Sequence, residues 1–132
     1  MITFQLIYYS KPFGFDLNTL HGILIASQAN NFRDNITGSL LCRADIYLQL
    51  LEGPLDKVEK AYKRIKDDDR HIDVKCLLKE KTNKRFFPSW AMKDDPVKTW
   101  MWTKNEVDDG IIDKLPKSHF LNLFKKVADI SN

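Results

Sequence analysis

Cysteine is scarce in this 132-residue chain, which contains only Cys42 and Cys76. Neither lies in a CxxC pair or close to two histidines. Disulfide-stapled domains and structural zinc sites both depend on such patterns. We therefore expect neither a disulfide scaffold nor a zinc site.

Long apolar runs and blocks of like charge are also missing. No run reaches the ~20 residues of a membrane-spanning helix, and the N-terminus lacks the charged and apolar regions of a signal peptide. The net charge is only +3 and the lysines are scattered, which argues against nucleic-acid binding. Because 43% of the residues are hydrophobic, one sizeable core is possible. We expect a soluble cytoplasmic protein with neither nucleic acid nor membrane as a partner.

Common catalytic motifs are absent as well. The sequence contains no GxSxG, HExxH, P-loop or GxGxxG pattern. His21, His71 and His119 lie on different predicted elements, and none is beside a credible nucleophile. An acylphosphatase-like enzyme would need an anion-binding arginine after the first strand, where only Lys11 is found. We expect no enzymatic activity.

What is present is a clear alternation of strand and helix patterns. Strands are predicted at 2–10, 36–43, 46–53, 72–81 and 85–93, and helices at 16–31, from Pro54 through Ile65, at 106–115 and at 118–129. This order predicts an α+β, ferredoxin-like βαββαβ sandwich with an added fifth strand and C-terminal capping helices. The first and third strands would lie side by side at the centre. The first two helices would cover one face and the terminal helices the other.

Three details of this prediction can be checked directly. Leu17 belongs to the apolar stripe of the first helix, so it should face inward. Four alternating residues of the strand 72–81 should share one face: Ile72, Val74, Cys76 and Leu78. Pro88 lacks an N–H group, which favours an edge position for the strand 85–93.

A buried amide is the unusual feature of the strand 46–53. Gln49 lies among apolar residues on both faces, and its hydrogen-bonding groups need partners. Tyr8, on the neighbouring central strand, also needs one. Asn30 and Asn31 end the first helix beside the same space. Together they favour a site for a flat heterocycle with polar edges.

Each residue also has a purely structural interpretation. Tyr8 could keep its hydroxyl near the surface, Gln49 could be half-exposed, and Asn30 and Asn31 could cap the helix. Trp90 and Met92 could pack in the core. The chain could then be a ferredoxin-like small-ligand regulatory protein or an acylphosphatase-like protein.

Several segments, in the same order, resemble the BLUF family, sensors of blue light using FAD. They are "LIYYS" (6–10), "SQANN" (27–31), "DNITGSLL" (34–41), "YLQLLEGP" (47–54), "YKRIKDDDRH" (62–71) and "RFFPSWAMK" (85–93). The resemblance covers about residues 1–93 and departs somewhat in the loop after the first strand. It implies a flavin-binding domain at 1–93 and a helical cap of the same domain at 94–132. We expect no cyclase or phosphodiesterase domain to follow, as in the short, stand-alone members that the chain resembles.

By this resemblance, Tyr8 gives an electron and a proton to the excited flavin. Gln49 bridges Tyr8 and the N5/O4 edge of the flavin, while Asn31, with Asn30 beside it, bonds the ring carbonyl and N3 edge. Trp90 and Met92 belong to the strand that responds to the switch.

The remaining residues implied by the resemblance hold the cofactor. They are Ile23, Leu24, Ser27 and Ile65 around the ring, and Arg64, Asp68, Arg70 and His71 at its edge and tail. The expected cofactor is FAD, with FMN possible. The expected partners are a downstream response protein and further copies of this chain, reached through the edge strand or the C-terminal helix.

Overall fold

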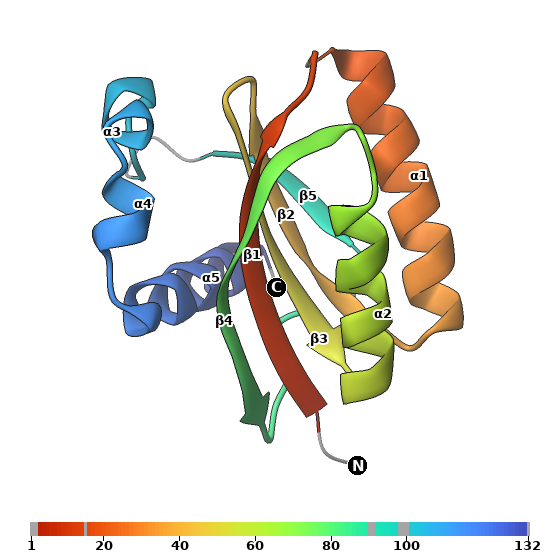
Figure 1. Ribbon diagram of the computed structural model, residues 1–132. Helices are drawn as coiled ribbons and strands as arrows, with labels where there is room; N and C mark the ends of the chain where they lie inside the picture. Colours follow the sequence, from red (N-terminus) through yellow and green to blue (C-terminus); the bar gives the residue numbers. More distant parts are fainter. Residues whose placement is uncertain (1–2, 15, 90–91, 98–100, 132) are drawn as a thin grey trace.

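A five-stranded mixed sheet forms the middle of the molecule (Figure 1). The computed structural model describes residues 3–14, 16–89, 92–97 and 101–131. Its strands are β1 (Thr3–Pro12), β2 (Thr37–Arg43), β3 (Ile46–Gly53), β4 (His71–Thr82) and β5 (Lys93–Pro96). Its helices are α1 (Leu17–Arg33), α2 (Leu55–Lys66), α3 (Lys104–Asp108), α4 (Ile111–Lys114) and α5 (Lys117–Ser131).

The predicted fold class is confirmed. The strand order is β4-β1-β3-β2-β5, with β1 and β3 antiparallel at the centre. Figure 1 shows α1 and α2 on one face of the sheet and α3, α4 and α5 on the other. Two apolar clusters fill the layers, one under α1 and α2 and one under the terminal helices. No helix in the described ranges is long and apolar enough to cross a membrane.

The central strands bring the two polar residues singled out in the sequence face to face. All residues of β3 are buried, as the doubly apolar pattern predicts. In the antiparallel register of β1 and β3, Tyr8 lies opposite Gln49. Their side chains therefore project from neighbouring positions toward the layer of α1 and α2.

The prediction of a strand over 85–93 is wrong. The strand β5 begins only at Lys93 and runs parallel to β2, at the edge of the sheet. The backbone N–H groups of Phe86 and Phe87 donate to the carboxylate of Glu52 at 2.7 and 2.9 Å. These donors are thus bonded to a side chain instead of a neighbouring strand. Pro88 has no N–H to offer.

The shared face predicted for β4 is also wrong. The register between β1 and β4 shifts, because Ile7 pairs with Leu78 while Tyr8 pairs with Cys76. One residue of β4 is extra at this bulge, and residues beyond it change face. Leu78 accordingly packs under the terminal helices, whereas Val74 packs under α1 and α2. Ile72 and Cys76 are exposed.

Helix positions differ from the prediction in two places. Leu17 is exposed, because the buried side of α1 is centred on Ile23 and Asn31, roughly a quarter turn away. The single helix predicted at 106–115 is divided into α3 and α4. Gly110 separates them with a φ of 84°, a left-handed conformation that breaks helical hydrogen bonding. Asp16 caps α1 by accepting from the Thr19 N–H at 2.7 Å.

Candidate functional site

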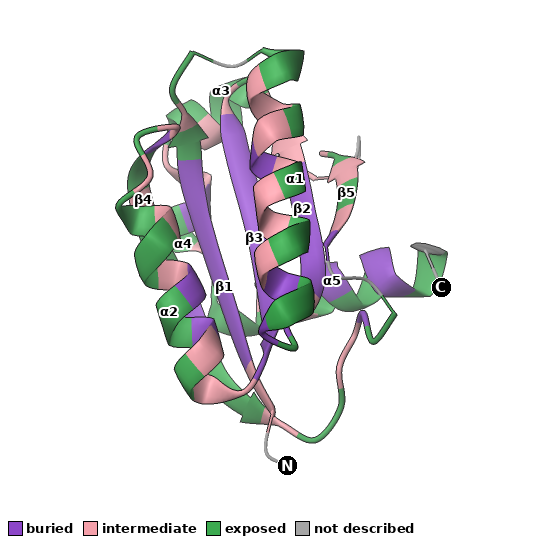
Figure 2. Cartoon of the chain, turned by 90° about the vertical axis from the view of Figure 1, so that its right-hand side faces the viewer, coloured by how far each residue is buried: buried purple, intermediate pink, exposed green. Residues whose placement is uncertain are grey.

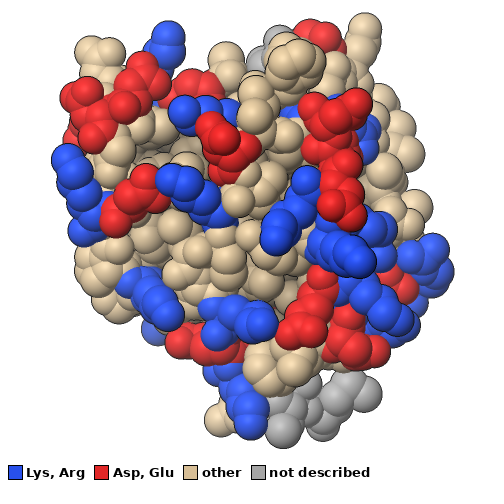
Figure 3. All heavy atoms as spheres, viewed as in Figure 1, with Lys and Arg blue, Asp and Glu red and all other residues tan. Residues whose placement is uncertain are grey.

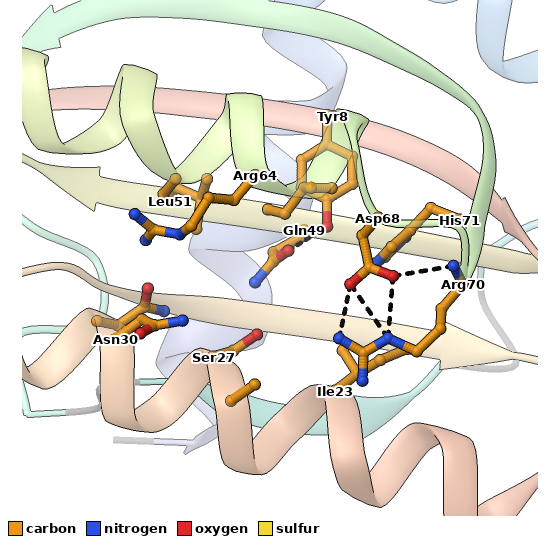
Figure 4. A pocket seen from close by; sticks show the side chains of 14 residues that line it. Tyr8, Ile23, Ser27, Asn30, Gln49, Leu51, Arg64, Asp68, Arg70 and His71 are labelled. Carbon is orange, nitrogen blue, oxygen red and sulfur yellow. Dashed lines mark hydrogen bonds and ion pairs between the residues drawn. The ribbon is translucent and has the colours of Figure 1, made fainter.

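A cavity of about 220 Å³ lies between α1, α2 and the central strands (Figure 4). Its walls combine apolar side chains from both helices with polar groups from the sheet and from the end of α2. The lining residues are Tyr8, Ile23, Ala26, Ser27, Asn30, Asn31, Gln49, Leu51, Ala61, Arg64, Ile65, Asp68, Arg70 and His71.

A chain of hydrogen bonds runs along the sheet at the base of this cavity. The Tyr8 hydroxyl donates to Gln49 Oε1. Gln49 Nε2 in turn donates to Met92 Sδ at 3.1 Å. A thioether sulfur is a weak acceptor, so the amide nitrogen is held much less firmly than the amide oxygen. All three side chains are buried.

The phenol of Tyr8 is kept neutral by its surroundings. Burial raises its pKa well above the usual value, and Tyr47, Tyr62 and Asp68 raise it further. Its ring lies 5.8 Å from the ring of Tyr62 and 6.2 Å from that of His71. Tyr8 therefore carries its proton in the resting protein.

Charged groups lie at both ends of the cavity (Figure 4). Arg70 pairs with Asp68, with 2.6 Å between Nη2 and Oδ2, and the backbone N–H of Arg70 also donates to that carboxylate. Arg64 reaches Asp34 at 3.4 Å. The Arg70 contact lowers the pKa of Asp68, and the Arg33 contact lowers that of Asp34. The side chains of Arg64 and Arg70 are partly exposed, so the cavity reaches solvent beside each of them.

His71 connects the cavity wall to β1. Its Nδ1 lies 2.8 Å from the buried hydroxyl of Ser10. Burial lowers the pKa of His71, Asp68 opposes that shift, and Arg70 adds to it. His71 is therefore neutral at pH 7.

Acidification should destabilise the folded protein through His71. Because its pKa is lower in the folded state, the unfolded chain binds a proton more readily. The contribution of His71 to stability is fully present above the unfolded-state pKa of about 6.5, and it is lost as the pH falls toward the folded-state pKa. Between pH 7.5 and pH 5.5, we expect the free energy of unfolding measured with urea to fall by about 1 kcal/mol more in wild type than in His71→Gln. An equal pH dependence in both proteins would contradict this role.

Most of the predicted site residues meet in this one cavity. Leu24 is not among its lining residues and packs against the neighbouring apolar cluster instead. Asn31 is buried in the cavity wall with Asn30 beside it. Met92 lies behind Gln49. Trp90 lies outside the described residues.

Sequence reasoning missed five contributors, one of which is Leu51 of β3 in the cavity lining. Ala26 and Ala61 line the cavity, and their small side chains leave room between the two helices. The side chain of Gln28 donates to the backbone oxygen of Met92 at 3.3 Å. Glu52, fully buried, binds the segment that leads to Met92. A charged residue inside a strand apolar on both faces was the available signal for Glu52.

The cavity fits a flat ring system with polar edges. Ile23 on α1 and Ile65 on α2 supply apolar walls, while amide, phenol and imidazole groups supply the edge contacts. The volume is below the roughly 300–1,000 Å³ of sites that enclose a whole ligand. A ring would thus occupy the cavity, and a longer tail would extend out of it. Within the described residues no cluster of three or more His, Cys, Asp or Glu could hold a metal ion.

Comparison with known proteins identifies this arrangement. The family profile described as "Sensors of blue-light using FAD" (BLUF) matches residues 3–93. The chain belongs to the BLUF family. As a BLUF protein, it is a blue-light sensor that uses a flavin.

Relatives and solved structures agree with the assignment. The β subunit of photoactivated adenylate cyclase from Euglena gracilis is 36% identical over 74 residues, which are 55% of this chain and 9% of that protein. The structure of a bacterial light-regulated adenylyl cyclase is 36% identical, with a TM-score of 0.70 over 92% of this chain and 35% of that one. The dark-state structure of BlrB, a BLUF protein, has a TM-score of 0.81 over 96% of both chains at 24% identity, which shows the fold alone. The chain therefore spans only a small part of the cyclase relatives.

Proposed function

We propose that the hydrogen-bond chain Tyr8–Gln49–Met92 is the light switch of this BLUF protein. The observation that carries the proposal is the position of Gln49. Its amide lines the cavity between α1 and α2, while its oxygen accepts from Tyr8 and its nitrogen donates to Met92. A bound flavin would supply a strong oxidant and proton acceptor on absorbing blue light.

Gln49 is suited to switching because its two ends differ. Turning the amide by half a turn would place Nε2 beside Tyr8 and Oε1 beside Met92. The Tyr8–Gln49 bond would then reverse its direction, with the phenol oxygen as acceptor. The bond to Met92 Sδ is weak, so losing it costs little. The cavity would thus hold a different set of donors and acceptors with the same covalent structure.

The other lining residues would hold the cofactor. Asn31 and Asn30 would bond the polar edge of the ring, and Ser27 lies on the same helix face. Arg64 would contact the ring edge on the side of Asn30, while Arg70, paired with Asp68, would approach the phosphates at the opposite end (Figure 4). His71 completes this end. We propose FAD as the cofactor, with FMN as the alternative that the same ring contacts accept.

The light signal would be transmitted through contacts with other proteins, without turnover of a substrate. Met92 precedes β5, the edge strand next to β2, so a change at Gln49 would reach an element with unpaired backbone groups. We propose residues 1–93 as the flavin-binding domain and 94–132 as its cap, because the terminal helices share one apolar cluster with β1 and β3. A response protein or another copy of the chain would read the change.

Absorption spectroscopy tests the proposal. Purified protein, supplemented with FAD where needed, should be yellow. Its flavin band should move slightly to the red under blue light and return in darkness. Free FAD under the same lamp is the control and should show no reversible shift. A chain that takes up no added FAD, as a light-indifferent regulatory protein would, contradicts the proposal.

A further inference from the structure

The outer face of α1 exposes three large apolar side chains and carries no charged residue from Leu17 to Phe32. Leu17 is 77% exposed, Ile25 is 55% exposed and Phe32 is 85% exposed. Asn18, His21 and Gln28 are the exposed polar residues between them. No lysine, arginine, aspartate or glutamate occurs from Leu17 to Phe32, in a chain where 30% of the residues are charged.

The other helix on this side of the sheet is built differently. The exposed residues of α2 include Asp56, Glu59, Lys60 and Lys63, as expected for a solvated helix face. Charged side chains cover this part of the surface in Figure 3. Figure 2 shows α1 outermost, with no other drawn element in front of it. Its inner side already lines the flavin cavity, so the outer face is a separate surface.

We propose that the outer face of α1 is a self-association surface on which a second copy packs its own α1 in the antiparallel direction. The spacing of the exposed residues carries the geometry. With a two-fold axis between Leu24 and Ile25, Leu17 of one copy lies level with Phe32 of the other. His21 then lies level with Gln28, and the two Ile25 side chains meet near the axis. Leu17 and Phe32 are about 22 Å apart along the helix.

Charge favours a second copy as the occupant. Each copy carries a net charge of +3, and a two-fold contact brings like groups together. The charge-free face of α1 permits such a contact without repulsion. A helix lying on a membrane surface would carry lysines or arginines along its polar side. The stretch from Leu17 to Phe32 carries none.

The size of the face predicts weak association. One helix face about 22 Å long supplies less than the ~800 Å² per partner of a standard interface. We therefore expect a reversible dimer with a dissociation constant on the order of 10 μM. This inference does not depend on the light switch.

Sedimentation velocity tests this surface. Protein concentrations from about 1 to 300 μM lie on both sides of the expected dissociation constant. Wild type should dimerise reversibly in darkness, and Ile25→Glu should raise the dissociation constant roughly a hundredfold by burying unpaired carboxylates. Ile130→Glu is the matched control, because Ile130 is 61% exposed on α5, and it should dimerise like wild type. A wild type that stays monomeric, or loss of the dimer in Ile130→Glu instead, overturns the proposal. An unchanged thermal midpoint and flavin band in Ile25→Glu would show that folding and the proposed function are intact.

Cysteine cross-linking tests the antiparallel direction and does not require Ile25→Glu to fold. The background is Cys76→Ser, because Cys76 is exposed while burial raises the pKa of Cys42 to about 11. A mixture of Leu17→Cys and Phe32→Cys proteins should give a mixed disulfide under mild oxidation, and neither alone should cross-link. Cross-linking of each variant with itself at equal yield would indicate parallel helices and overturn the arrangement. Absence of any cross-link together with binding to phospholipid vesicles would assign the face to a membrane.

Discussion

Tyr8→Phe is expected to retain the flavin and to lose the reversible red shift completely. The substitution removes one oxygen from a fully buried ring and leaves the ring packing against Tyr62 unchanged. It also removes the donor to Gln49 Oε1. The proton and electron source of the switch would be gone, while the apolar walls that hold a ring remain.

The measurement is a difference spectrum before and after blue light on the flavin-loaded variant. Tyr62→Phe is the matched control, because it also deletes a phenol hydroxyl. The ring centroids of Tyr62 and Tyr8 are 5.8 Å apart. The control should keep the full shift. Gln49→Leu should behave like Tyr8→Phe, since it removes both ends of the amide bridge. A normal photocycle in Tyr8→Phe would remove Tyr8 from the mechanism.

The central part of the fold and site follows from local sequence patterns. Alternation of apolar residues predicts β1 and β3, and their place at the centre follows from the order of elements. Once these strands are neighbours, Tyr8 and Gln49 must approach each other. The structure shows that they do, with a direct hydrogen bond. The match to the family profile covers residues 3–93, which include these strands.

The errors arise where non-local contacts override the local pattern. The stretch 85–93 has strand-like alternation, but Glu52 binds two of its backbone N–H groups and the chain turns there. The bulge opposite Ile7 and Tyr8 reverses the faces of β4, and no residue pattern marks it. Leu17 is apolar and exposed on the outer face of α1, so periodicity alone places it in the core.

Glu52 stabilises the fold through donors from two other segments. Its carboxylate accepts from Gln5 Nε2 at 2.9 Å on β1 and from the backbone N–H groups of Phe86 and Phe87. Burial raises its pKa, and these three donors partly oppose the rise. The residue therefore connects the central strands to the segment that leads toward Met92.

Replacing Glu52 with leucine should cost about 3 kcal/mol of unfolding free energy, because two buried donors and one half-buried donor lose their acceptor. Glu52→Gln retains one acceptor oxygen and should cost about half as much. Glu59→Leu is the surface control. It removes an exposed carboxylate paired with Lys79 at 3.1 Å, and the expected change is within about 0.5 kcal/mol. Urea unfolding of the flavin-loaded proteins measures all three. If Glu52→Leu unfolds at the same urea concentration as wild type, the buried carboxylate does not stabilise the 86–87 segment. Glu52 would then not hold in place the chain that leads from this segment to Met92 and the edge strand β5.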